Sequence, residues 1–206
     1  MTARIGILVS GRGSNMEALL DAMAEGRIPA EPAIVVSNDP EAPALSKAAA
    51  RGVATHATDH RAFRGRREAF DAEIRAVLED AGCDIVACAG FMRIMTPVML
   101  EPFEGRMLNI HPSLLPAFRG LDTHARARAA GCAILGCTVH EVSEELDGGH
   151  ILGQAATATR PNEDLETLKG RILRLEHCLY PRVLAAFIAD RDRLRTAPIA
   201  LLDRDA

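Results

Sequence analysis

The first half of the chain alternates short apolar runs with segments in which apolar residues recur every three or four positions. The short runs predict buried β-strands at residues 4–10, 33–39, 53–56, 84–90 and 106–112. The segments between them predict helices at residues 16–24, 42–51 and 60–80. Strands that alternate with helices favour an α/β fold: a doubly wound, mostly parallel, Rossmann-like sheet with helices on both faces.

The pattern changes in the second half, which predicts an antiparallel C-terminal portion. A helix over residues 122–130 has Asp122 or Thr123 as its expected cap. Two strands follow, joined by the turn-forming residues of SEELDGG, at residues 133–142 and 150–160.

The last helix is expected to start at residues 162–164, which supply a cap and an acidic first turn. Apolar residues from Leu165 to Val183 would dock it on the sheet. Residues 195–206 are expected to form a tail on the surface.

Composition and charge narrow the possible classes of protein. The 206 residues are 48% hydrophobic, which is enough for the core of a single domain over residues 1–206. A net charge of −4 and a pI near 6.0 lack the excess of Lys and Arg that nucleic-acid binding requires, so we expect no nucleic-acid partner. No apolar run has the length of a membrane span, and the first apolar run is too short for a secretory signal. We therefore expect a cytoplasmic protein with no membrane contact.

The five cysteines are expected to be reduced thiols rather than disulfides or metal ligands. Cys83 and Cys88, and also Cys132 and Cys137, have a spacing that zinc sites permit. Cys88 and Cys137, however, lie in apolar strand-like runs, where small buried thiols are ordinary. We therefore expect no metal.

A glycine-rich loop, GRGSN, follows the first predicted strand and precedes the first helix. Gly11 and Gly13 allow a tight turn, Ser14 offers a hydroxyl, and free amides at the start of a helix attract an anion such as phosphate. The loop is not a dinucleotide-binding fingerprint, because Met16 replaces the third glycine, and it has no P-loop lysine. The alternative is a glycine turn in which Ser14 or Asn15 caps the helix.

The predicted strand at residues 106–112 carries two polar side chains near its end. Because side chains alternate along a strand, Asn109 and His111 share one face, while Leu108 and Ile110 face the opposite layer. Ligands bind at the carboxyl ends of strands in open α/β sheets, and a carboxamide beside an imidazole can donate two hydrogen bonds to a developing oxyanion. The alternative is that Asn109 stabilises a turn and His111 is a half-buried histidine with a satisfied partner.

Three other features each allow a structural and a functional interpretation. Residues 92–95 follow a strand end and form an apolar surface with one cation, although they could equally pack a connector. Asp147 lies in an Asp-Gly-Gly turn sequence and by itself is interpreted as the turn former. Glu176 lies beside the apolar stripe of the last helix, where it could reach a site or pair on the surface with Arg171 or Arg174.

Five motifs, taken together, resemble the folate-dependent phosphoribosylglycinamide formyltransferase family; in chain order they are SGRGSN, AGFMRI, LNIHPSLLP, ELDGG and LEHCLYP. LNIHPSLLP followed by LDGG is also typical of the wider group of formyltetrahydrofolate-using transferases. The resemblance runs from the first strand to the last helix and implies the formyltransferase fold. It further implies that a formyl group moves from 10-formyltetrahydrofolate to the amine of glycinamide ribonucleotide in purine synthesis, without a metal.

The resemblance also implies roles for individual residues. Gly13, Ser14 and Asn15 would cradle the substrate phosphate, and Glu176 would contact the same substrate. The catalytic set would be Asn109, His111 and Asp147. The folate site would be lined by Arg67, Met92, Arg93, Ile94, Met95, Asn109, Ser143, Glu144, Glu145, Leu146 and Asp147.

In this interpretation the amine attacks the formyl carbon, and Asn109 together with a protonated His111 stabilises the tetrahedral oxyanion. Asp147 would favour the imidazolium and help to move the amine's proton, directly or through water. The expected partners are the two small-molecule substrates, and the expected assembly is a monomer or a homodimer.

Three other functions are open from the sequence. A formyltetrahydrofolate hydrolase would use water in place of the amine, although that family carries an additional N-terminal regulatory domain. Methionyl-tRNA formyltransferase needs a further C-terminal domain, whereas this chain ends at Ala206. A non-catalytic phosphosugar-binding module would use GRGSN without any chemistry.

Overall fold

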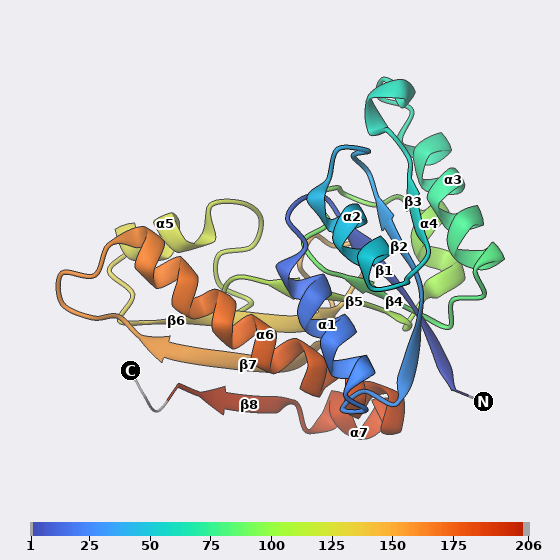
Figure 1. Ribbon diagram of the computed structural model, residues 1–206. Coiled ribbons are helices and arrows are strands. Elements are labelled where there is room, and N and C mark those ends of the chain that lie inside the picture. The colour runs from blue at the N-terminus through green and yellow to red at the C-terminus, as the bar shows by residue number, and fades with distance from the viewer. Residues whose placement is uncertain (1, 204–206) are drawn as a thin grey trace.

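The apolar runs lie side by side in one eight-stranded sheet, in a computed structural model that describes residues 2–203 (Figure 1). The strands are β1 (Ala3–Val9), β2 (Ala30–Ser37), β3 (Thr55–Ala57), β4 (Ile85–Cys88), β5 (Met107–His111), β6 (Ile134–Glu141), β7 (Ile151–Ala158) and β8 (Ile199–Leu202). Their order across the sheet is β3-β2-β1-β4-β5-β6-β7-β8. β1 to β5 pair in parallel, β6 is antiparallel to both β5 and β7, and β8 runs parallel to β7. The predicted mostly parallel sheet with an antiparallel C-terminal portion is confirmed.

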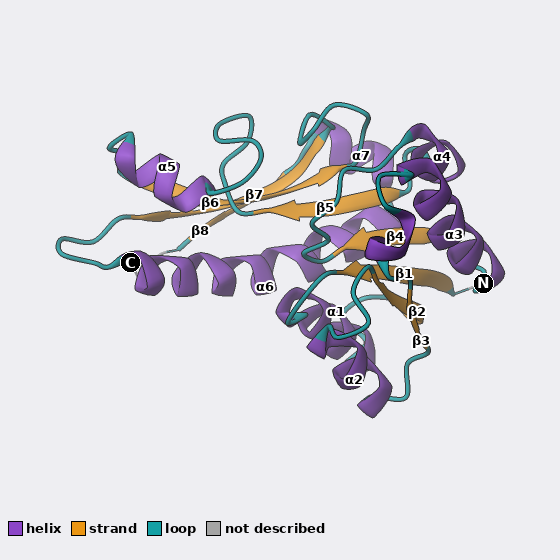
Figure 2. Ribbon diagram, turned by 90° about the horizontal axis from the view of Figure 1, so that it is seen from above, coloured by secondary structure: helices purple, strands orange, loops and turns teal. Residues whose placement is uncertain are grey.

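Helices cover both faces of this sheet (Figure 2). They are α1 (Ser14–Ala24), α2 (Pro43–Ala50), α3 (Arg67–Asp80), α4 (Pro97–Leu100), α5 (Thr123–Ala129), α6 (Leu165–Ala189) and α7 (Arg191–Thr196), with 3₁₀ turns η1 (His60–Phe63) and η2 (Glu101–Phe103). One core cluster joins α1, α2 and α6 to the sheet through residues that include Leu19, Ala44 and Tyr180. A second cluster joins α3 and α4 to the other face through Phe70 and Met99. The predicted doubly wound α/β architecture is therefore confirmed.

The strand order reverses at β1, which lies between β2 and β4. In open α/β sheets a crevice forms at such a point, outside the carboxyl ends of the strands. Here the loops after β1 and β4 are joined, because the Ser10 amide donates to the Gly90 carbonyl at 3.1 Å and the Met92 amide donates to Ser10 Oγ at 2.8 Å. The fold thus brings the GRGSN loop and the segment after β4 to the sheet edge at which β5 also ends.

The predicted helix at residues 60–80 is wrong in its first part. The chain forms the short turn η1 first, and α3 begins only at Arg67. Between them, Arg64 and Gly65 have positive φ angles of 42° and 88°, which an α-helix cannot contain. Apolar spacing does not reveal such a break, because it indicates which faces are buried and not the sign of φ.

The expected tail at residues 195–206 does lie at the surface over its described part, but it is wrong as a tail, because it contains regular structure. α7 ends within this stretch, and β8 follows it and pairs with β7. Residues 204–206 lie outside the described residues. Both elements are short, and β8 depends on β7 for its hydrogen bonds, so the local pattern does not predict them.

Helix length and composition also bear on membrane contact. Within residues 2–203, no helix combines the length and the apolar character that crossing a bilayer requires.

Candidate active site

The loop after β1 leads directly into α1 and leaves a hollow of about 260 Å³, lined in part by Gly13, Ser14 and Asn15. Gly13 is the N-cap residue with a left-handed φ of 74°, and no side chain among residues 2–203 caps the helix. A Cβ at Gly13 would lie only 2.6 Å from the Ala44 Cβ. The alternative in which Ser14 or Asn15 caps α1 is therefore wrong. The amides at the start of the helix stay available to an anionic ligand.

Glu176 lies behind this hollow, because Asn15 Nδ2 donates to Glu176 Oε2 at 2.6 Å and both residues are over nine-tenths buried. The alternative of a surface carboxylate paired with Arg171 or Arg174 is wrong, since Arg171 instead binds Glu163 at 2.9 Å. Burial raises the pKa of Glu176 to about 7, although the hydrogen bond from Asn15 opposes that shift. Asn15 Oδ1 has no hydrogen-bond partner within the described chain, so this buried acceptor can serve a ligand.

At the end of β5, His111 faces the carboxylate of Asp147. His111 Nδ1 lies 3.4 Å from Asp147 Oδ2, and both side chains are more than nine-tenths buried. The Gly120 amide donates to the same carboxylate at 2.8 Å, while His111 Nε2 lies 3.1 Å from the Phe118 carbonyl. Asp147 has a positive φ of 49°, so it does form the turn, and the turn brings its charge to the histidine.

His140 on β6 completes the cluster, although its local sequence predicts no functional role. Its Nδ1 donates to the Glu141 carbonyl at 2.8 Å, and Asn109 Nδ2 lies 3.2 Å from its Nε2. Asp147 Oδ1 is 3.7 Å from the same Nε2. Burial lowers the pKa of His140, although the Glu141 carbonyl and Asp147 oppose that shift. A neutral ring with its proton on Nδ1 can therefore accept the Asn109 hydrogen bond at Nε2.

The signal for His140 lies in strand pairing. Asn109 is opposite His140 in the antiparallel β5–β6 ladder, and directly opposed side chains share a face and touch. A local hydrophobic pattern predicts that both strands exist, but it does not give their register. Sequence reasoning could have found the residue only by pairing the two strands first.

A narrow pocket of about 100 Å³ opens beside this cluster. Of the residues predicted for the folate site, it is lined by Arg93, Ile94, Met95, Asn109, Ser143, Glu144, Glu145, Leu146 and Asp147. The Arg93 guanidinium lies 5.0 Å from the centroid of the Phe70 ring, which fixes it by a cation–π contact. Met92 is 68% exposed and lines the hollow at the start of α1 instead. Arg67, at the first position of α3, is exposed and lines neither space.

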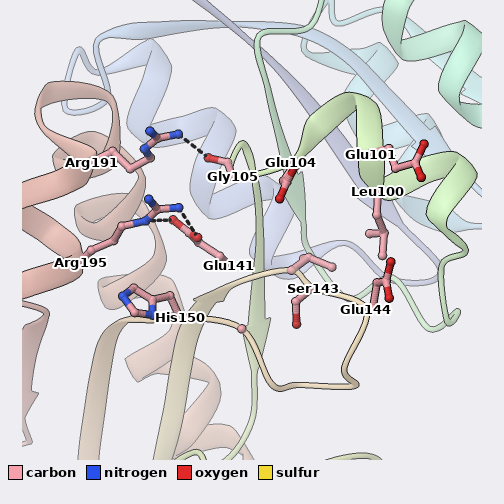
Figure 3. Close-up of a pocket in the computed structure, with 12 residues that line it drawn as sticks. Leu100, Glu101, Glu104, Gly105, Glu141, Ser143, Glu144, His150, Arg191 and Arg195 are labelled. Carbon is pink, nitrogen blue, oxygen red and sulfur yellow. Dashed lines mark hydrogen bonds and ion pairs between the residues drawn. The ribbon is translucent and has the colours of Figure 1, made fainter.

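A larger hollow, of about 770 Å³, is lined in part by Ser143, Glu144, Gly149 and His150 (Figure 3). Ser143 and Glu144 line both this hollow and the narrow pocket. Asn109, His111 and Asp147 do not line it. The volume of a hollow therefore does not identify the candidate active site, whereas the convergence of Asn109, His111 and Asp147 does.

Within residues 2–203, no group of three or more His, Cys, Asp or Glu side chains is arranged to hold a metal ion. The cysteines of the described chain are free thiols. Burial raises the pKa of Cys83 to about 11 and that of Cys88 to about 12, so both thiols stay protonated and are poor metal ligands near neutral pH.

Comparison with known proteins identifies a family. The family model described as formyl transferase matches residues 3–184. The chain is 39% identical over 185 residues to phosphoribosylglycinamide formyltransferase of Escherichia coli, a match that covers 90% of this chain and 87% of that protein. It is 41% identical over 182 residues to the human trifunctional purine biosynthetic protein adenosine-3, covering 88% of this chain but only 18% of that protein. The chain thus spans about a fifth of the length of its human and bovine trifunctional relatives.

Among solved structures, the chain resembles glycinamide ribonucleotide transformylase 1 from Symbiobacterium toebii with a TM-score of 0.89 and 42% sequence identity. That match covers 91% of this chain and 88% of the other. The sequence match and the structural match therefore identify the same family of proteins.

Proposed function

Because the chain belongs to the formyl transferase family, we propose that it transfers the formyl group of 10-formyltetrahydrofolate to the amine of N1-(5-phospho-D-ribosyl)glycinamide. The product would be the N-formyl compound of de novo purine biosynthesis. The names and coverage of the bacterial and trifunctional relatives support this assignment. The two substrates are the only partners that the proposal requires.

One observation carries the proposal. The hollow at the start of α1 and the cluster of Asn109, His111, His140 and Asp147 open at the carboxyl ends of strands in one sheet. A phosphorylated substrate held at the first could extend its amine toward the second. A phosphosugar-binding module would need the hollow but not the buried histidine and carboxylate beside it.

The ribonucleotide would bind through the first turn of α1. Amides of Gly13, Ser14 and Asn15 would donate to its phosphate, where the helix dipole also favours negative charge. Glu176 and Asn15 Oδ1 are buried acceptors behind the hollow, so they suit donor groups of the same substrate.

The folate would bind in the narrow pocket beside the cluster. Its pterin would contact the loop Ser143–Asp147, which lines that pocket. Arg93, Ile94 and Met95 would line the wall, while Met92 and Arg67 would lie at the rim and meet the outer part of the ligand. The chain, residues 1–206, would act as one domain, with phosphate-binding βα units first and the folate and catalytic sites after them.

The chemistry would be a direct transfer. The amine attacks the formyl carbon, forming a carbon–nitrogen bond and a tetrahedral oxyanion. One N–H of Asn109 is directed to His140, which leaves its second N–H for that oxygen. His111 can donate from Nε2 if the oxyanion replaces the Phe118 carbonyl there, and a charged acceptor is the stronger partner.

Collapse of the intermediate would break the bond from the formyl carbon to N10 of the folate. The attacking amine must lose a proton, and N10 of the departing tetrahydrofolate must gain one. While the oxyanion forms, the charge of Asp147 would stabilise a protonated His111 at 3.4 Å. Asp147 would then accept the proton of the amine, directly or through water, and pass it on to N10. No covalent enzyme intermediate is required.

We assign this activity to the cytoplasm. The support is the cysteine chemistry, since free thiols at Cys83, Cys88, Cys132, Cys137 and Cys178 are typical of a reducing compartment.

The test is turnover of 10-formyltetrahydrofolate with and without glycinamide ribonucleotide. Turnover that depends on the amine, with formation of the N-formyl product, is the expected result. Equal turnover without the ribonucleotide would instead favour a formyltetrahydrofolate hydrolase. Binding of the ribonucleotide with no turnover in either case would favour the phosphosugar-binding module.

A further inference from the structure

The hollow of about 770 Å³ contains an ion pair that joins α7 to the end of β6. Arg195 of α7 donates from Nε and Nη2 to the two carboxylate oxygens of Glu141, at 2.8 and 2.7 Å (Figure 3). The Glu141 side chain is about nine-tenths buried, whereas Arg195 is nearly one-third exposed. Arg195 lies beyond residues 3–184, the part that the family model matches.

Glu141 is the residue that holds His140 in place. Its carbonyl accepts the His140 Nδ1 hydrogen bond at 2.8 Å, and its amide donates to the His150 carbonyl at 2.9 Å. The β6–β7 register shifts between Val139 and His140, so the regular ladder is interrupted one residue before Glu141. Such an irregularity bends the strand locally, so contacts on either side of it help to set the direction of the strand end.

The carbonyl of Glu141 is also packed closely from the loop side. A Cβ at Gly149 would overlap that oxygen. The backbone at Glu141 is therefore fixed between the loop and β5, whose Met107 carbonyl accepts from the Val142 amide at 2.8 Å. From the side of α7, the bidentate bond from Arg195 holds Glu141.

We propose that Arg195 is a positioning residue for the formyl transfer: through Glu141 it fixes the tautomer and the position of His140, which in turn orients Asn109. The Arg195 guanidinium binds the Glu141 carboxylate, and the backbone carbonyl of Glu141 accepts from His140. The His140 ring in turn contacts the Asn109 amide, which would donate to the oxyanion. This inference rests on the proposed function for its kinetic consequence. The tautomer of His140 can be measured without any turnover.

The charge of Arg195 matters because of what its loss leaves behind. A carboxylate that is mostly buried and has lost its cation must take up a proton or move toward water. Either change moves the end of β6 and weakens the hydrogen bond that keeps the His140 proton on Nδ1. The Nε2 atom of His140 then carries a proton for part of the time and cannot accept the hydrogen bond from Asn109 Nδ2.

The main variant is Arg195→Ala, and the matched control is Arg193→Ala, an exposed arginine in the same helix. We expect Arg195→Ala to lower kcat by roughly tenfold to a hundredfold, because small displacements of catalytic groups have effects of this size. KM for either substrate should change by less than about twofold. Arg193→Ala should leave kcat and the KM values for both substrates unchanged.

A second variant separates positioning from simple loss of stability. Glu141→Gln with Arg195→Met removes both charges and keeps the approximate shapes, so no unpaired charge is buried. We expect this double variant to regain stability while its kcat stays low, because the bidentate bond to the end of β6 is still missing. If Arg195→Ala does not fold, the double variant and Arg195→Lys, which keeps the charge but not the bidentate fork, carry the same test.

The direct readout is the ¹⁵N NMR spectrum of His140, followed from pH 5 to pH 8. Asp147, His111 and Arg119 also act on this ring, and Glu141 is its neighbour on β6, so the wild-type titration is the reference. We expect Nδ1–H in the wild type and a mixture of tautomers or a raised pKa in Arg195→Ala.

Three results would overturn the proposal. The first is an unchanged His140 spectrum with unchanged kcat in Arg195→Ala. The second is a lower melting temperature with normal kcat well below it, which would make the pair a structural contact only. The third is a double variant with normal kcat, which would mean that the unpaired charge, and not the loss of positioning, lowered kcat in Arg195→Ala. If the wild type transfers no formyl group, the proposed function fails, while the His140 spectrum still decides whether Arg195 positions the ring.

Discussion

The two halves of the candidate site are built in different ways. The loop from Ser10 to Asn15 is continuous in sequence, and its chemistry resides mainly in backbone amides at the start of α1. The cluster of Asn109, His111, His140 and Asp147 is assembled from β5, β6 and a turn, and its chemistry resides in side chains. A backbone site is changed by altering the path of the chain, whereas a side-chain site is changed by removing single groups.

The loop and the cluster should also differ in whether they affect substrate binding or the rate of the reaction. Anion binding at a helix start needs only correctly directed amides, so the loop should contribute chiefly to the affinity for the ribonucleotide. The buried cluster holds a carboxylate between two histidines, an arrangement suited to charge that develops during reaction. Variants in the two regions should therefore divide into KM effects and kcat effects, and the following experiments test that division.

The largest effect is expected from His111→Ala. Loss of one donor to an oxyanion typically lowers kcat by about 10²–10³-fold, and KM for both substrates should change little. Steady-state kinetics measures both constants. His56→Ala, in the edge strand β3, is a control for loss of a histidine. Near-normal kcat in His111→Ala would remove this residue from the catalytic set.

Gly13→Ala should act on KM. The substitution places a side chain at a φ of 74° and its Cβ 2.6 Å from Ala44 Cβ, so the loop must move. We expect KM for the ribonucleotide to rise about tenfold, with a much smaller change for the folate. Gly26→Ala introduces the same positive φ, 73°, with open space around it, and should affect stability only. A normal ribonucleotide KM in Gly13→Ala would separate the loop from the substrate.

Glu176→Gln tests the buried carboxyl behind the loop through stability. Because burial raises the Glu176 pKa from 4.5 to about 7, the folded chain holds this proton more tightly than the unfolded chain. Its contribution of about 3 kcal/mol to the free energy of unfolding is complete below pH 4.5 and is lost as pH rises through about 7. Urea unfolding at pH 5 and pH 8 should show a larger loss in the wild type than in the variant. Equal losses would mean that Glu176 titrates normally.

The smallest effect is expected from Arg67→Ala. An exposed charge contributes up to about 1 kcal/mol, so KM for the folate should rise by no more than about fivefold, with kcat unchanged. Added salt should reduce the difference, because exposed charges are screened. Arg64→Ala, in the turn just before α3, is the control for a general loss of positive charge. An effect that is independent of salt would argue against a simple charge contact.

The difference between the two regions also explains how far the sequence could predict the site. GRGSN and the Asn109–His111 pair are local patterns, and period-two alternation correctly puts Leu108 and Ile110 in the core on the other face. The fold class follows from the same alternation of strands and helices. His140 and Arg195 could not be found in this way, because their roles depend on the β5–β6 register and on a contact between residues far apart in sequence. The break at Arg64 was missed since it depends on backbone dihedrals rather than on burial.

The two adjacent glycines of the Asp-Gly-Gly turn differ in how much substitution they should tolerate. The nearest atoms to a Cβ at Gly148 belong to the flexible Glu145 side chain, which can rotate away. A Cβ at Gly149 would meet the main chain of Glu141, which cannot rotate away. In a saturation library selected for growth without purines, position 148 should accept small residues, while position 149 should return glycine alone.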